Sequence, residues 1–167
     1  AEDFIWAVHA LADLGYREVN FNLGCPAGTV TAKGKGAGFL RSPDELERFF
    51  ASVFEKPLPI SVSVKTRLGW ANTAEFERLA DVFNHFPFAS VTIHARLKTD
   101  LYRGHARLAA FLEALKRLHH PVIYNGDIVT KDDALCVTQR FPDLTGIMVG
   151  RGLIADPALF RKLRGGK

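Results

Sequence analysis

One short stretch of this sequence combines the residue types and the spacing that catalysis needs. Residues 19–26 read VNFNLGCP, so Asn22 and Cys25 come at the end of an alternating apolar segment that predicts a strand. The glycine before Cys25 and the proline after it force a turn, which holds the thiol beside open space. A thiol has an ordinary pKa of about 8.5, so it is mostly protonated at neutral pH and can act as a general acid.

Polar side chains follow four more predicted strands, at the point where each strand ends. The polar residues are Lys65 and Arg67 at the end of 59–65, His94 and Arg96 at the end of 89–94, Asn125 and Asp127 after 122–124, and Arg151 after 145–149. Gly126 and Gly150 belong to the last two of these loops. A lysine ammonium at such a place can stabilise negative charge on a bound ring or phosphate. The last two loops suit a phosphate group, because they offer backbone N–H groups, a helix N-terminus and the forked donor of Arg151.

Helices are predicted between these strands. Apolar residues at helical spacing predict helices over 3–14, 43–54 and 108–118, and further helices after Asn72, Thr130 and Asp156. Ser42 with Glu45 predicts a capping box at the start of helix 43–54, and Thr130 with Asp133 predicts a cap at a later start. On the helix after Thr130, Cys136 is expected to pack in the core.

The strands, the first of them over 18–23, alternate with helices along the chain and no hairpin signal interrupts them, which indicates βαβ units and a parallel sheet. The predicted fold class is α/β, a partial (β/α)8 TIM barrel with five parallel strands, because a full barrel takes typically about 250 residues. Residues 1–167 are expected to form one incomplete barrel domain. The polar residues would then share the carboxyl-end face, which holds the active sites of barrels.

Composition sets further bounds. The chain has 167 residues, of which 47% are hydrophobic and 24% charged, which is typical of a soluble globular protein with a real core. It has no apolar run near the roughly 20 residues that cross a bilayer and no signal-peptide pattern at its start, so a cytoplasmic location is expected. Its two cysteines lie far apart, and no cluster has metal-ligand spacing, so neither a disulfide nor a metal site is expected.

The formal net charge is +4, and the excess is local. Lys33, Lys35 and Arg41 lie in a glycine-rich stretch, and Arg96 belongs to a second basic stretch over 96–107. Such loops could bind a polyanion, or could be only a solvated surface.

One glycine motif is set aside. Residues 150–155 fit the dinucleotide fingerprint G-x-G-x-x-A after a strand. Only 12 residues follow, with no second strand and no acidic residue about 20 positions on, so we reject a Rossmann interpretation.

Six pieces of the chain, in family order, resemble the tRNA-dihydrouridine synthase family, which are flavin enzymes on a TIM barrel. The pieces are NLGCP at 22–26, KGKGAG at 33–38, VKTRLG at 64–69, IHAR at 93–96, NGDI at 125–128 and MVGRG at 148–152. Only the first is distinctive by itself, but together they span nearly the whole chain.

The resemblance implies FMN across the barrel mouth, NADPH as the reductant and tRNA as the substrate. Lys65 would contact the pyrimidine edge of the flavin and His94 its ribityl-phosphate side. The phosphate contacts implied are Asn125, Gly126, Asp127, Gly150 and Arg151.

The resemblance also implies the chemistry of the substrate. Hydride would pass from the flavin to C6 of a uracil flipped out of tRNA, and Cys25 would protonate C5 from the other face. Asn22 and Arg67 are expected uracil or flavin contacts. The loop residues Lys33, Lys35 and Arg41 could hold RNA phosphates, and Arg96 is also expected to contact the substrate.

Two departures from the family pattern are visible. Leu97 stands where the family often has threonine, which removes the basis for a contact from that side chain. The first barrel strands and a C-terminal helical domain that grips tRNA are expected to be absent, so this chain alone is predicted to bind FMN weakly or not at all.

Two other functions stay open at this point. One is an FMN barrel acting on a free pyrimidine, such as a dihydroorotate dehydrogenase, against which the basic loops and the Cys-Pro turn argue. The other is a non-catalytic RNA-binding fragment in which Cys25 and Lys65 are structural. The chain predicts neither the uridine position modified nor the oligomeric state.

Overall fold

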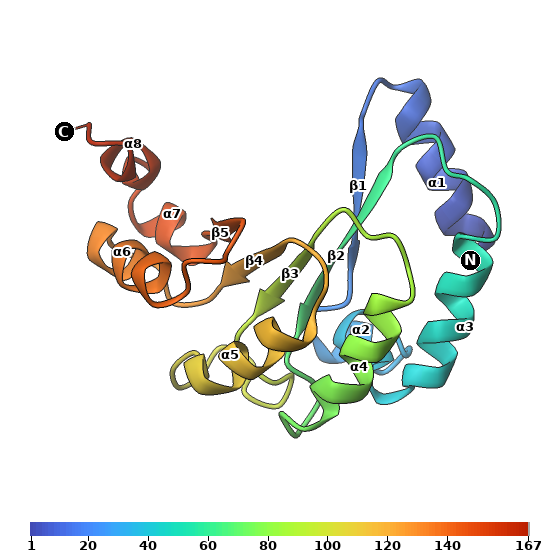
Figure 1. Ribbon diagram of the computed structural model, residues 1–167, viewed down its shortest axis with the longest axis horizontal. Coiled ribbons are helices and arrows are strands. Elements are labelled where there is room, and N and C mark those ends of the chain that lie inside the picture. The colour runs from blue at the N-terminus through green and yellow to red at the C-terminus, as the bar shows by residue number, and fades with distance from the viewer. Residues whose placement is uncertain (167) are drawn as a thin grey trace.

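Five parallel strands form one sheet, in which the order in space is the order along the chain (Figure 1). The computed structural model describes residues 1–166. The strands are β1 (Glu18–Asn22), β2 (Ser61–Arg67), β3 (Val91–His94), β4 (Val122–Asn125) and β5 (Gly146–Met148). Each crossover therefore advances the chain by one strand in the same direction, which is how a (β/α) barrel is built. Because β1 and β5 do not pair, the sheet is five strands of a TIM barrel, as predicted.

Helices connect the strands and cover the sheet. They are α1 (Glu2–Asp13), α2 (Gly28–Thr31), the 3-10 helix η1 (Gly36–Arg41), α3 (Pro43–Val53), α4 (Glu75–Asn84), α5 (Leu108–Arg117), α6 (Lys131–Arg140), α7 (Arg151–Ala155) and α8 (Leu159–Leu163). Figure 1 shows α1 and α3 at one end of the sheet and α6, α7 and α8 grouped at the other. The short elements α2, η1 and α7 were not predicted, because so few residues do not show a hydrophobic period. The equally short α8 was predicted only from the Asp156-Pro157 start signal before it.

Two boundary predictions need correction. Strand β2 starts at Ser61 rather than Pro59, which has no N–H to donate, and it continues to Arg67 because Arg67 pairs with His94 of β3. The Ser42 side chain makes no capping hydrogen bond, so the box predicted there is wrong. The box at Thr130 is present, since its Oγ1 accepts from the Asp133 N–H at 3.1 Å and its own N–H donates to the Asp133 carboxylate at 2.8 Å.

Phenylalanine side chains make up much of the core between sheet and helices. Phe50 of α3 is fully buried, with its ring centroid 4.8 Å from that of Phe88 and 5.5 Å from that of Phe21. Edge-to-face pairs of this kind add about 0.5–1.5 kcal/mol to the burial of each ring. They tie α3 to β1 and to the start of β3, and so position the carboxyl ends of these strands.

The prediction for Cys136 is wrong, because this residue is exposed on α6. Ala134 and Val137 carry the buried face of that helix, three residues apart. Cys136 points away from that face because successive residues of a helix turn by about 100°.

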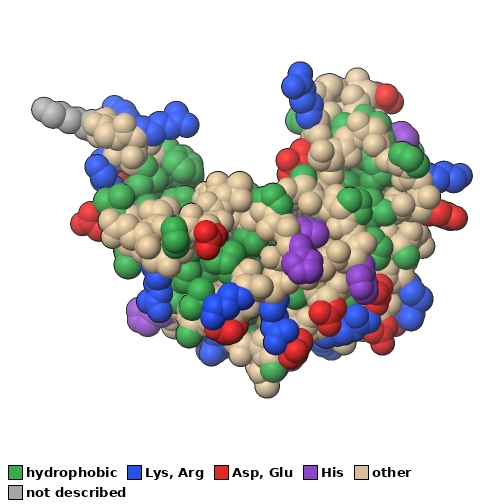
Figure 2. All heavy atoms as spheres, in the orientation of Figure 1, with side chains coloured by type: hydrophobic (Ala, Val, Ile, Leu, Met, Phe, Trp, Pro, Cys, Tyr) green, Lys and Arg blue, Asp and Glu red, His purple; other side chains and the backbone are tan. Residues whose placement is uncertain are grey.

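The surface in Figure 2 mixes acidic and basic side chains, and a broad hollow separates the end with α8 from the end with α1. Among the helices of residues 1–166, none has the length and apolar character that crossing a membrane requires.

Candidate active site

The register of the sheet brings the predicted residues into two neighbouring rows. One row crosses β1, β2 and β3, and the other crosses β2, β3 and β4. The first row is Asn22, Lys65 and Thr92, and the second is Arg67, His94 and Asn125. Residues two apart on a strand point to the same face, so both rows share one face of the sheet.

These rows form the floor of a cleft of about 780 Å³ at the carboxyl ends of the strands. The predicted residues that line it are Asn22, Cys25, Lys65, Arg67, His94, Asn125, Gly126, Asp127, Gly150 and Arg151. Lys33 and Lys35 are exposed outside it, and Arg96 is buried beneath it. The cleft therefore brings together ten of the predicted site residues, from the ends of all five strands. The role of each residue stays a prediction.

Three hydrogen bonds hold the turn that presents Cys25. The side-chain oxygen of Asn22 accepts from the Gly24 N–H at 2.9 Å, as in an Asx turn. Arg67 Nε donates to the Gly24 carbonyl at 2.9 Å, and the Cys25 carbonyl accepts from the Ala37 N–H at 3.0 Å. The turn that carries the thiol is thus held by side chains of β1 and β2 and by the backbone of η1.

The glycine-rich run supports this turn from behind. Gly36 has a φ of +55°, and a Cβ there would lie 3.0 Å from the Cβ of Cys25. A Cβ at Gly38 would lie 2.6 Å from the Thr31 carbonyl oxygen. Both positions need glycine because another chain segment occupies the space a side chain would fill. The run therefore packs against the cysteine turn.

Arg67 is fully buried and binds three carbonyl oxygens. Besides Gly24, it donates from Nη1 to Leu97 at 2.9 Å and to Leu101 at 2.8 Å. Burial lowers the pKa of Arg67, although a guanidinium stays charged in proteins. Arg67 thus joins the Cys25 turn to the loop over residues 97–101, in addition to lining the cleft.

Lys65 stands beside the same turn. Its Nζ lies 3.5 Å from the place a Cβ would take at Gly24. Burial, and then the charge of Arg67, lower the pKa of Lys65. Two cations next to each other in a partly buried place make this side of the cleft favourable for an anion.

His94 is neutral at physiological pH and has a defined tautomer. Burial first, then the charges of Arg67, Lys65 and Arg96, lower the pKa of His94 to about 3. Arg96 Nη1 lies 3.2 Å from His94 Nε2 and can only donate, so Nε2 accepts. The ring proton is then on Nδ1, which is left as a donor.

Arg96 is not placed to hold RNA, contrary to the role expected for it. Only 1% of its surface is exposed, and its Nη2 donates to the two carboxylate oxygens of Asp127 at 2.8 and 2.7 Å. The same nitrogen donates to the Gly104 carbonyl at 2.6 Å. Its position after a strand led to the prediction. In the structure its N–H donors are used by partners within the protein and are not open to solvent.

Asp127 is the centre of the opposite side of the cleft. It also accepts from the Ala106 N–H at 2.8 Å and from Arg151 Nη2 at 3.4 Å. Burial raises the pKa of Asp127, but the hydrogen bonds from Arg96 and Ala106 and the nearby charges outweigh it, so the pKa lies below its ordinary value. Asp127 is therefore an ionised group that orients two arginines.

The last two loops approach each other closely. The Asn125 side chain donates to the Met148 carbonyl at 2.8 Å and so joins β4 to β5. A Cβ at Gly152 would collide with the Ile128 carbonyl oxygen, and Gly126 has a φ of +146°. Arg151 has a side chain that is 57% exposed and extends at the mouth of the cleft.

Tyr102, which was not among the predicted site residues, is 54% exposed and lines the cleft. The guanidinium carbons of Arg67 and Arg151 lie 5.3 and 5.2 Å from its ring centroid, and the His94 ring lies 6.3 Å away. Tyr102 thus bridges the two sides of the cleft. Its only signal in the sequence is that it is the one aromatic residue in the long polar loop 95–107.

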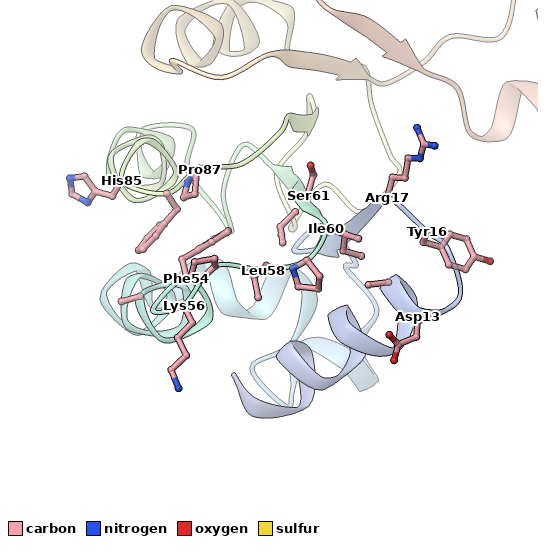
Figure 3. A pocket seen from close by; sticks show the side chains of 16 residues that line it. Asp13, Tyr16, Arg17, Phe54, Lys56, Leu58, Ile60, Ser61, His85 and Pro87 are labelled. Atoms are coloured by element: carbon pink, nitrogen blue, oxygen red, sulfur yellow. The ribbon is translucent and has the colours of Figure 1, made fainter.

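A larger hollow of about 1090 Å³ lies at the amino ends of the strands. Its lining comes from segments that precede β1, β2 and β3, and Figure 3 shows the charged ends of Arg17 and Lys56 pointing apart. Polar groups do not converge there, and in barrels the amino-end face serves stability. Residues 1–166 contain no group of three His, Cys, Asp or Glu side chains arranged for a metal ion.

The fold and this site define a class: a TIM-type α/β barrel protein with a cationic cleft, beside a thiol, at the carboxyl ends of its strands. The comparison with known families is more specific. The profile of the family described as Dihydrouridine synthase (Dus) matches residues 1–166, so this chain belongs to the dihydrouridine synthase family.

Curated relatives agree with this. A protein named "Probable tRNA-dihydrouridine synthase" from Staphylococcus epidermidis is 33% identical over 159 residues, which are 91% of this chain and 47% of the relative. A protein named "tRNA-dihydrouridine(16) synthase" from Haemophilus influenzae is 34% identical over 161 residues, which are 95% of this chain and 51% of the relative. The chain spans about half the length of the curated relatives it matches.

Proposed function

We propose that this chain is the catalytic part of a tRNA-dihydrouridine synthase, which reduces uridines of tRNA to 5,6-dihydrouridine with FMN as cofactor and NADPH as reductant. The observation that carries the proposal is that the Cys25 thiol, the Lys65 ammonium and the Arg151 loop line one cleft. The names of the relatives supply the substrate, and we expect the reaction in the cytoplasm, where tRNA is used.

The donor set of the cleft fits FMN. Lys65 and the Nδ1–H of His94 are donors beside the two buried arginines, suited to the electron-rich edge and the ribityl chain of a flavin. Asn125, Gly126, Gly150 and Arg151 would hold the phosphate, because the loops they form are close to each other and end in an exposed guanidinium. Asp127 would act indirectly, by orienting Arg151. When bound, the flavin takes electrons from NADPH and supplies hydride to C6 of the uracil.

The chain's own part in the reaction is to hold the base and deliver a proton. Cys25 would donate its Sγ proton to C5, so that one hydride and one proton together saturate the C5–C6 double bond. The Asn22 side chain and Arg67 fix the turn that carries the thiol, so they would position the proton donor. A splayed uracil needs such an enclosed cleft, because C5 and C6 are stacked in folded RNA.

Lys33 and Lys35 would contact the phosphates of the tRNA. They are exposed at the end of α2, next to the run that packs on Cys25. Their charge suits a strand that must pass the thiol before its uracil enters the cleft.

The direct test is Cys25→Ala in the full-length protein. We expect the dihydrouridine content of tRNA to fall to background in a host without other such enzymes, while bound flavin, read by visible absorbance, stays near one per protein. Cys136→Ala is the matched control, since this exposed thiol lies on α6, outside the cleft.

Unchanged dihydrouridine in the Cys25 variant would refute the catalytic assignment. Purified full-length protein without flavin would refute the cofactor. Turnover of free dihydroorotate, with none on tRNA, would favour a pyrimidine oxidoreductase instead.

A further inference from the structure

We propose that Arg41 and Lys98, both held against the indole of Trp70, form a clamp for a backbone phosphate of the RNA strand whose uracil enters the cleft. The clamp lies outside the cleft lining and is a second contact site on the same rim. The inference rests on the proposed function, since it presumes an RNA substrate.

Two cations share one aromatic ring. The Arg41 Cζ lies 4.4 Å from the Trp70 ring centroid, and the Lys98 Nζ lies 4.3 Å from it. The attraction of a cation to an aromatic ring is about 0.5–1 kcal/mol at an exposed site, and it helps to hold each of these two cations at the indole. Within residues 1–166 neither cation forms an ion pair, although nine other pairs are formed. Two charges held at one indole are thus left for the phosphates of an external polyanion.

The platform beneath these cations is rigid. The Lys98 N–H donates to the Gly69 carbonyl at 3.0 Å, and the Thr99 N–H donates to the Trp70 carbonyl at 3.0 Å, so two loops are joined. The Glu75 carboxylate accepts from the Trp70 N–H at 2.6 Å and from the next two N–H groups. That carboxylate is occupied by the turn, and it fixes the backbone that carries the indole. Preorganised donors lose little entropy on binding.

The position of the clamp favours the RNA backbone as its ligand. Arg41 ends η1, whose first residue, Gly36, packs against Cys25, so the clamp is on the thiol side of the cleft. Lys33 and Lys35 come just before η1 in the chain and are exposed, so they add to the basic residues on this side. A base is a poorer fit, because the ring on which it would stack already contacts two cations. The 2′-phosphate of NADPH has the same chemistry as a backbone phosphate, so the test must separate the two sources.

The test is the double variant Arg41→Gln and Lys98→Met in the full-length protein, with tRNA binding measured at several salt concentrations. We expect affinity to fall roughly 10-fold at moderate salt, and the slope of log K against log salt to become less steep by about 1–2, as for the loss of one or two phosphate contacts. The rate and KM for flavin reduction by NADPH, measured without tRNA, should not change. Trp70→Leu should reproduce part of the loss, and Trp70→Phe should retain more affinity.

The matched control is Lys131→Met with Arg140→Gln on α6. It removes the same charge from exposed positions, and the Arg140 guanidinium also lies over a ring, 5.7 Å from the Phe141 centroid. An unchanged salt slope in the test variant, an equal change in the control, or a raised KM for NADPH instead of weaker tRNA binding would each overturn the clamp. If the unaltered protein bound no tRNA, the proposed function itself would fail.

Discussion

Two arginines lie at the carboxyl ends of neighbouring strands, Arg67 as the last residue of β2 and Arg96 just after β3. Both are buried, yet their partners differ. Arg67 is 0% exposed and donates to backbone carbonyls of three segments. Arg96 is 1% exposed and donates to the carboxylate of Asp127. One guanidinium keeps its net charge inside the protein, and the other is neutralised.

The difference divides the cleft into two electrostatic halves. On the Cys25 side, neither Arg67 nor Lys65 forms an ion pair within residues 1–166, although the charge of Asp100 acts on Arg67. This half therefore keeps a positive potential for an anionic or electron-rich ligand. On the other side, the ion pair fixes the loops after β3 and β4 and leaves Arg151 to face solvent. Burying an unpaired charge costs stability, which fits a region shaped by function rather than by folding.

Breaking the ion pair between Arg96 and Asp127 should have the largest effect on stability. Asp127→Asn leaves Arg96 buried beside a neutral amide, and we expect the free energy of unfolding of the full-length protein to fall by about 3–5 kcal/mol in urea denaturation. Asp156→Asn is the control, because it breaks an exposed pair with Lys162 and should cost less than about 1 kcal/mol. Equal losses in the two variants would remove the distinction between the sides.

Removing the guanidinium of Arg67 should lower the free energy of unfolding by a smaller amount. Arg67→Met leaves the carbonyls of Gly24, Leu97 and Leu101 without their donor, but it also removes a buried charge, so we expect a net loss of about 2–3 kcal/mol. Arg67→Lys should recover little, since one ammonium cannot reproduce the fork. A loss larger than that of Asp127→Asn would contradict the comparison.

The histidine between the two arginines should give the protein a pH dependence. Its folded pKa of about 3 lies below its ordinary value of 6.5, so as pH falls the unfolded chain takes up a proton first. Stability is therefore full above about pH 6.5 and falls progressively toward pH 3, with a contribution of about 2 kcal/mol lost by pH 5.

Urea denaturation at pH 7 and at pH 5 measures this, and the range excludes most carboxylate titration. His94→Asn should lose less stability between the two values than the unaltered protein. The same loss in both would show that His94 is not held neutral.

The smallest effect is expected at Lys65, and with opposite sign. Lys65→Met removes a charge that burial and Arg67 disfavour, so we expect stability without cofactor to rise by about 0.5–1 kcal/mol. Flavin content should fall at the same time, since the cation proposed to face the ring is gone. A lower free energy of unfolding in this variant would show that Lys65 stabilises the fold instead.

Much of the fold follows from local pattern. Local pattern predicted all five strands, the five long helices and the short α8, and the cap at Thr130 was predicted from residues only three apart. The failures lie where spacing in the chain does not decide the outcome. Cys136 stands among apolar residues but on the exposed side of its helix, and Ser42 has the right neighbours for a cap that its side chain does not make.

For the site, the sequence by itself determined which polar residues end each strand, because parallel strands bring those ends to one rim wherever the helices between them pack. It could not determine which charges stay free. Arg67 is the last residue of β2 and Arg96 comes two residues after the end of β3, and the partners Gly24 and Asp127 that distinguish them lie 43 and 31 positions away along the chain. Only the tertiary structure brings carbonyl groups to Arg67 and a carboxylate to Arg96. Whether a buried guanidinium is neutralised therefore depends on neighbours in space and not on neighbours in the sequence.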